Sequence, residues 1–142
     1  MADTAAPRAA RAIHPLHGAL LAGAVPLFLG AFLSDLTYGG SAEIQWSNFA
    51  QWLLVGAMIF TGFGLLWAFI ALLRRRAWRA WPMLCFLLLL AAFVVGLIDC
   101  FVHARDAWGI MPAAPILSGI ATLLVLLAMA LGLWSQRAGE PK

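Results

Sequence analysis

Four long apolar segments separated by short polar breaks constrain the fold of this sequence more than any other feature. The segments cover residues 16–34, 49–73, 82–102 and 113–134. Each is close to the roughly 20 residues that a helix needs to cross about 30 Å of hydrocarbon. Because lipid offers no hydrogen-bonding groups, each segment must satisfy its backbone internally, as a helix does. The sequence therefore predicts an all-α polytopic membrane protein with four transmembrane helices in a compact bundle.

The amino-acid composition also indicates that the protein lies in a lipid bilayer. Of the 142 residues, 64% are hydrophobic and 11% are charged, whereas soluble proteins have roughly half and about a quarter. The excess apolar surface requires the lipid bilayer as its partner. The net charge of +3 does not indicate a nucleic-acid partner, because the basic residues lie beside apolar segments and not on a soluble module.

The positions of lysine and arginine predict the orientation. Eight of the nine basic residues lie before the first segment, between the second and third, or after the fourth, and only Arg105 lies in the other loops. By the positive-inside rule, both termini are cytoplasmic. In a bacterium, such a multi-pass protein of the inner membrane would direct its other loops to the periplasm. Residues 14–135 form the four-helix domain, residues 1–13 a mobile cytoplasmic tail and residues 136–142 a second cytoplasmic tail.

Small residues recur at helical spacing in the first two segments and predict the faces on which these helices meet. The two stripes comprise Ala19, Ala22, Gly23, Pro26 and Gly30, and Ala57, Thr61, Gly64 and Ala68. The ends of the first and third segments also resemble each other around Asp35 and Asp99, which suggests two related helical hairpins. Cys85 and Cys100 are about 22 Å apart along one helix, which excludes a disulfide between them.

His14 and His17 mark the start of the first segment. Two imidazoles three residues apart are candidate ligands for a cofactor, and haem b is the cofactor that we consider. The alternative is that His14 caps the helix while His17 lies at the membrane interface. Pro15 fits the first helical turn in either case.

The opposite end of the predicted bundle carries a candidate polar site. Asp99 and His103 are four residues apart on one helical face, and Asp35 closes the first segment. Ionisable residues within a span suggest proton handling or the binding of a small polar ligand. The alternative is a hydrogen-bonded cluster at the interface, because Asp99 is about one turn from the predicted end of its helix. Three further residues can join the cluster: Tyr38, Arg105 and Asp106.

The motifs of most enzymes and metal sites are missing from the sequence. There is no phosphate-binding glycine loop, no HExxH, no CxxC and no nucleophile elbow. We therefore predict no catalytic residue and no metal site, and we interpret the five serines, Ser118 among them, as boundary or packing residues. One haem iron cannot join His17 to His103, since the predicted topology separates them by nearly the membrane thickness.

The order of several short motifs adds a family resemblance. His14, Pro15 and His17 lead into a helix that contains Pro26 and ends at Asp35, and the third segment ends in Gly96-Leu97-Ile98-Asp99. From Ile13 to Trp134 the chain resembles the bacterial membrane proteins grouped as domain-of-unknown-function family 2231. The resemblance implies a four-helix inner-membrane protein and no particular activity.

Three functions are compatible with these patterns. The first is a non-enzymatic redox or electron-transfer component, or a membrane partner of a periplasmic oxidoreductase, using the histidines. The second is a small proton-coupled transporter, expected as a homo-oligomer, using Asp35, Asp99 and His103. The third is a structural subunit whose small-residue faces bind another membrane protein.

Overall fold

The computed structural model describes residues 15–75, 80–105 and 107–137, and its regular elements within these ranges are all helical. They are α1 (Pro15–Ser41), α2 (Ile44–Arg75), α3 (Ala80–His103), the short 3-10 helix η1 (Ala107–Ile110) and α4 (Ala113–Arg137). The all-α fold is confirmed. The predicted tail at residues 1–13, together with His14, lies outside the described residues, as do residues 138–142 of the second tail.

All four long helices are able to cross a membrane. The shortest, α3, has 24 residues, which at 1.5 Å per residue extend about 36 Å. Each helix contains an apolar stretch of the length and hydropathy of a membrane span. Large apolar side chains cover the outside of the bundle, and Trp52, Phe101 and Trp134 are 77%, 69% and 70% exposed. Lipid is the solvent that such a surface needs, and the chain is a multi-pass membrane protein.

Helices α1 and α2 extend beyond the apolar segments that predict them. α1 continues through Thr37 and Ser41, whose hydroxyls donate to the carbonyls of Leu33 and Thr37, each at 2.8 Å. It ends where Ala42 adopts a left-handed φ of 57°, and α2 begins two residues later. Hydropathy identifies only the part of a helix that lies in hydrocarbon, so polar turns that prolong it are not detected.

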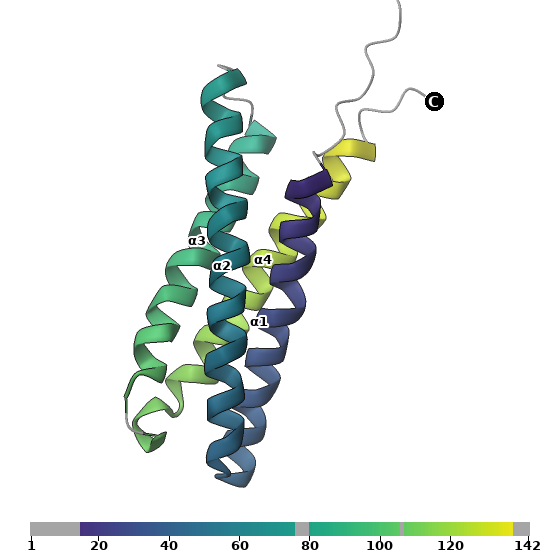
Figure 1. The fold of residues 1–142 in the computed structure, drawn as a ribbon. Coiled ribbons are helices and arrows are strands. Elements are labelled where there is room, and N and C mark those ends of the chain that lie inside the picture. The colour runs from purple at the N-terminus through teal and green to yellow at the C-terminus, as the bar shows by residue number, and fades with distance from the viewer. Residues whose placement is uncertain (1–14, 76–79, 106, 138–142) are drawn as a thin grey trace, which may run out of the picture.

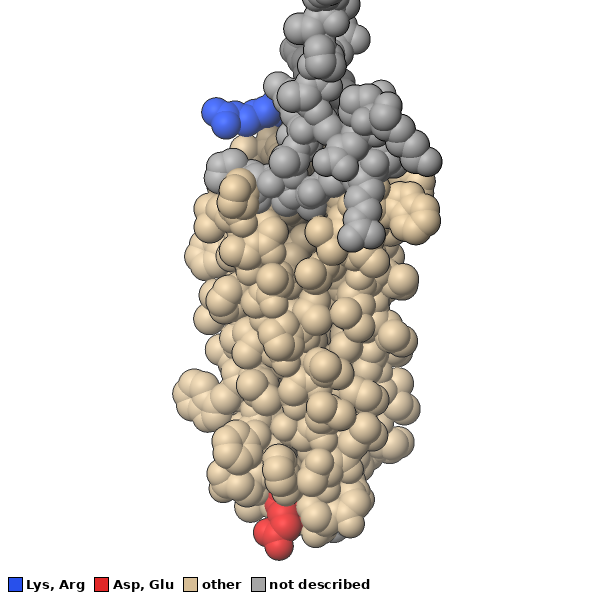
Figure 2. Space-filling view, turned by 90° about the vertical axis from the view of Figure 1, so that its right-hand side faces the viewer, with Lys and Arg blue, Asp and Glu red and all other residues tan. Residues whose placement is uncertain are grey.

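The four helices form a closed ring in which each contacts the next (Figure 1). α1 packs on α2, α2 on α3, α3 on α4, and α4 back on α1. The beginning of α1 and the end of α4 lie at the same end of the bundle, which we call the terminal end. The α1–α2 turn and η1 lie at the opposite end, which we call the distal end. Among the described residues visible in Figure 2, Lys or Arg lies near the terminal end and Asp or Glu at the distal end.

An apolar core fills the centre of the ring. From α1 it receives Leu21, Ala24, Phe28 and Ala31. The other helices contribute the buried residues Leu54, Ala57, Leu89, Ala92, Ala121 and Val125. Phe28 and most of these residues are fully buried. The centre of the monomer is therefore packed with side chains.

The small-residue stripe predicted on α1 is partly wrong. Ala19, Ala22 and Pro26 are exposed, whereas Gly23 lies against Phe60 and Gly30 against Leu53. The face of α1 that enters the core alternates small residues with Leu21 and Phe28. In lipid the outward face of a helix is as apolar as the inward one, so small residues alone do not identify the packed face.

The stripe predicted on α2 is closer to the observed packing. Ala57 and Thr61 are fully buried, and Gly64 lies close to Leu89 of α3 and Leu21 of α1. Gly64 thus meets two neighbouring helices at once.

Candidate functional site

Asp35 is a fully buried carboxylate on the inward face of α1. It follows Ala31 by four residues and precedes Tyr38 by three, so it continues the stripe that α1 directs into the bundle. Six residues separate it from the end of α1, which places it about 9 Å inside the distal end of the helix.

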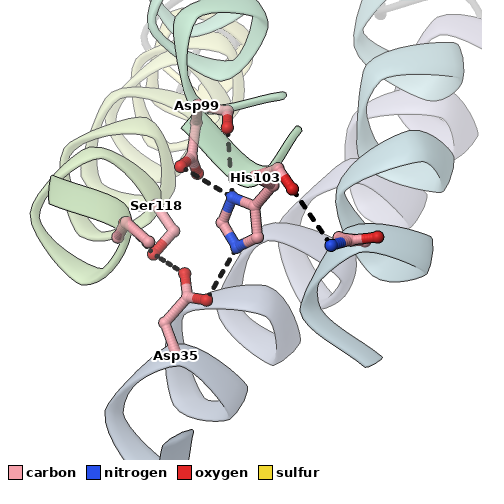
Figure 3. Close-up of polar contacts among 6 residues, drawn as sticks. Asp35, Asp99, His103 and Ser118 are labelled. Atoms are coloured by element: carbon pink, nitrogen blue, oxygen red, sulfur yellow. Dashed lines mark hydrogen bonds and ion pairs between the residues drawn. The ribbon is translucent and has the colours of Figure 1, made fainter. Parts of the chain in front are cut away.

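Asp99 and His103 occupy one face of α3, as their spacing of four residues predicts. Asp99 is 0% exposed and His103 4%. The Nδ1 atom of His103 is 3.0 Å from the backbone oxygen of Asp99 and 3.2 Å from its Oδ1 atom. On the other side of the ring, Nε2 lies 2.9 Å from Oδ1 of Asp35. One imidazole therefore lies between two buried carboxyl groups (Figure 3).

The two remaining helices also reach this level. The Ser118 hydroxyl of α4 lies 2.7 Å from Oδ2 of Asp35 and 2.9 Å from the carbonyl of Ala114. From α2, the Gln51 amide donates to the carbonyl of His103 at 3.1 Å. We call Asp35, Gln51, Asp99, His103 and Ser118 the polar layer. It links all four helices at a single height near the distal end.

Hydrogen-bond geometry indicates which groups of the polar layer carry protons. A backbone carbonyl only accepts, so Nδ1 of His103 donates to the oxygen of Asp99. When Asp35 is ionised, Nε2 must also donate, and the ring is then a positively charged imidazolium held by a charge-assisted bond. Two ionised carboxylates and one imidazolium sum to a single negative charge inside the bundle.

The Asp99 side chain is the unsatisfied member of the layer. Neither Oδ1 nor Oδ2 has a hydrogen-bond partner among the described residues. The 3.2 Å separation from Nδ1 is close enough for an ion pair, but the Nδ1 hydrogen points to the backbone carbonyl instead. A buried carboxylate without hydrogen bonds is costly, and each such group in a folded protein needs an explanation.

Apolar residues seal the polar layer on both sides. Toward the distal end lies a small cluster, which we call the cap, formed by Tyr38, Val102, Ile110 and Ala114. Toward the terminal end lies the apolar core. The cap explains why Asp99 is fully buried although it is only four residues from the end of α3.

A pocket of about 180 Å³ lies beside the layer, between α2 and α3. It is lined by Gln51, Leu54, Val55, Cys100, His103 and Ala104. Gln51 and His103 are thus the two residues of the polar layer that line the pocket.

Comparison with known proteins identifies the family of this chain. A family model described as Predicted membrane protein (DUF2231) matches residues 13–141. The chain belongs to this family. No curated protein and no solved structure matches it. The match covers all four helices and every residue of the polar layer, and it confirms the resemblance found from the short motifs.

The structure of this DUF2231 chain brings together the three residues predicted at the distal end, Asp35, Asp99 and His103. Arg105 is exposed, Tyr38 belongs to the cap, and Asp106 lies outside the described residues. Asp35 and Asp99 are 0% exposed and His103 is 4% exposed within the bundle. The alternative of a hydrogen-bonded cluster at the membrane interface stays a prediction.

Of the two predicted cofactor residues, only His17 lies among the described residues, and it lies at the terminal end. His17 is half-buried in the first turn of α1, and its Nδ1 atom is buried without a hydrogen-bond partner among the described residues. Eighteen residues of α1 place it about 27 Å from Asp35. His17 at the terminal end and His103, which contacts Asp35 at the distal end, therefore belong to different regions. The described residues contain no group of three His, Cys, Asp or Glu arranged for a metal ion. Cys85 and Cys100 are both free thiols.

Two members of the layer, Gln51 and Ser118, are not among the predicted site residues. Ser118 occupies the distal part of α4, with Thr122 one turn further along and bonded to its carbonyl at 2.7 Å. Buried polar residues one turn apart in an apolar helix are a sequence signal of an inward face. Gln51 is an uncharged polar residue within the second apolar segment, and it carries the same signal.

Proposed function

We propose that this DUF2231 protein takes up and releases a proton at the Asp35–His103–Asp99 cluster, as a small proton-coupled transporter does. The observation that supports the proposal is the buried Asp99 carboxylate, which has no hydrogen bond although it lies in a layer where Asp35 has two. Ionisable groups inside a membrane span mark proton relays and ion pathways more often than they serve packing.

The charge of the layer indicates what it lacks. Two carboxylates and one imidazolium leave one negative charge without compensation, and an uncompensated buried ion costs several kcal/mol. One proton transferred from water to the Asp99 carboxylate gives a neutral layer and hydroxide in the medium. Release of that proton to water reverses the step. Tyr38 in the cap and Cys100 beside the pocket are the other titratable side chains that lie near the layer.

A redox role receives less support from the site. Both ring nitrogens of His103 are engaged, one by Asp35 and one by the backbone of Asp99, so the ring offers no free lone pair to a haem iron. His17 lies near the opposite end, and its proposed companion His14 is not among the described residues. The distal histidine therefore suits proton chemistry better than axial ligation.

The polar layer also supports a second function, that of a structural membrane subunit. Its bonds connect all four helices, and such a layer fixes the register of a bundle in lipid, where apolar packing has little preference for one register. This function requires the bonds of Asp35, Gln51 and Ser118, but it does not require the unbonded Asp99 carboxyl. The Asp99→Asn variant therefore separates the two functions.

Two measurements test the proton site. The infrared C=O stretching band of a protonated carboxyl group, recorded on the protein in lipid nanodiscs over a range of pH, is expected to vanish in Asp99→Asn. In liposomes containing a pH-sensitive dye, the wild type is expected to dissipate an imposed pH gradient several-fold faster than Asp99→Asn.

The matched control is Glu43→Gln, an exposed acid in the α1–α2 turn, which should resemble the wild type in both measurements. A band that persists in Asp99→Asn contradicts the proton site, and a normal band without flux contradicts transport.

For orientation, we propose cytoplasmic termini in the inner membrane, on the basis of the arginine distribution and the common end of α1 and α4. A periplasm-active reporter inserted after Gly40, in the last turn of α1 at the distal end, should be active in cells. The same reporter fused after the C-terminus should be inactive. The reverse pattern would invert the topology.

A further inference from the structure

The polar layer is closed in three directions. The cap covers it toward the distal end, the apolar core toward the terminal end, and its own helices α1 and α4 on the side of Asp35 and Ser118. Asp35 and Asp99 are both 0% exposed. A proton that reaches Asp99 must therefore enter on the side where α2 meets α3.

The pocket lies on that side, and its lining is not uniformly apolar. Leu54, Val55 and Ala104 form its apolar wall, while Gln51 and His103 contribute polar groups. The Nε2 atom of Gln51 donates to the His103 carbonyl, and the amide retains its oxygen as an acceptor. Cys100, the residue directly after Asp99, completes the wall.

We infer that this pocket is a hydrated site through which water carries protons to and from His103 and Asp99. The inference rests on the proposed function and adds its access route. About 180 Å³ far exceeds the 10–15 Å³ of probe-occupied volume that one water needs, and water also requires polar partners, which Gln51 and His103 supply. A lipid chain is the alternative occupant, and it would keep the pocket dry.

The two cysteines of α3 provide a matched test of hydration. Both are half-buried thiols on the same helix, but Cys100 lines the pocket and Cys85 does not. Charged methanethiosulfonate reagents react with thiolates, which form in contact with water. In nanodiscs, where both membrane faces are accessible, Cys100 in a Cys85→Ala background is expected to react several-fold faster than Cys85 in a Cys100→Ala background. Equal rates would overturn the hydrated pocket.

Filling the pocket tests the route directly. Val55→Trp places a large ring in the pocket and should slow both the labelling of Cys100 and the dissipation of a pH gradient several-fold. The control is Ile59→Trp, one turn along the same exposed face of α2 but outside the pocket, which should change neither. If Val55→Trp blocks labelling but leaves proton flux unchanged, the route is wrong.

Different experiments can refute the proposed access route and the proposed proton site. An unreactive Cys100 together with an infrared band that depends on Asp99 would refute the route and leave the proton site. A reactive Cys100 together with a band that persists in Asp99→Asn would show that the pocket is hydrated but that Asp99 is not the proton site. That result would refute both the proton site and the access route.

Discussion

Replacing Asp35 by alanine is expected to lower the unfolding free energy by about 3–5 kcal/mol, the cost of removing one partner from a buried ion pair. Asp35 accepts from His103 at 2.9 Å and from Ser118 at 2.7 Å. Its removal leaves a buried imidazolium and a buried hydroxyl without their shared acceptor. It also cuts the bonds that join α1 to α3 and α4. The loss should appear in SDS titrations of the micelle-bound protein followed by circular dichroism.

Two other variants of the polar layer are expected to lower the unfolding free energy less than Asp35→Ala does. Ser118→Ala removes one neutral donor, and membrane hydrogen bonds of this kind contribute about 0.6–1.7 kcal/mol. Asp99→Asn removes the ion pair at 3.2 Å but breaks no hydrogen bond and removes a buried charge, so its expected loss is smaller than that of Asp35→Ala. If Asp99→Asn destabilised the protein as much as Asp35→Ala, the assignment of Asp99 as the unbonded carboxyl would be wrong.

Gly96→Leu is the second substitution with a large expected effect. A Cβ atom at Gly96 would lie 2.7 Å from the sulfur of Met58 and 3.1 Å from the ring of Phe28. Methionine is flexible and can move, but the Phe28 ring is fully buried in the core. A leucine adds three further carbons to this junction of α1, α2 and α3. We expect a loss of about 1–3 kcal/mol from overpacking.

The control for this substitution is Gly18→Leu, because no atom lies within 4 Å of a Cβ at Gly18. Both substitutions replace a helical glycine by the same residue, so their helix propensities change alike. The measurement is the fraction of monodisperse protein that survives heating in detergent. Gly96→Leu should reduce the midpoint temperature and Gly18→Leu should not. Equal midpoints would show that the core accommodates the added volume.

Sequence and structure agree best where the determining physics is local. The apolar segments predict the four helices because the hydrocarbon thickness sets their length, whatever their neighbours are. Asp99 and His103 share a face because they are four residues apart on one helix. Cys85 and Cys100 cannot pair for a similarly local reason, since one rigid helix separates them.

The tertiary structure alone decided which sides of the helices meet. In a soluble helix, polarity identifies the outward face, but here the lipid-facing and core-facing residues are equally apolar. The inward direction of Ala24 and the outward direction of Ala22 are therefore not encoded in local hydropathy. For Ser118 and Gln51, polarity within an apolar segment indicates an inward face, but only the packing of α4 and α2 shows that they meet Asp35 and His103.

The burial of Asp99 was likewise decided by the tertiary structure. Its distance from the helix end predicts a side chain close to water, yet it is fully buried, and α1 and η1 contribute Tyr38 and Ile110 to the apolar cap at this end of the bundle. A sequence determines how far a side chain lies from the end of its own helix. Whether water reaches that side chain depends on segments distant in the chain, which come together only when the bundle packs.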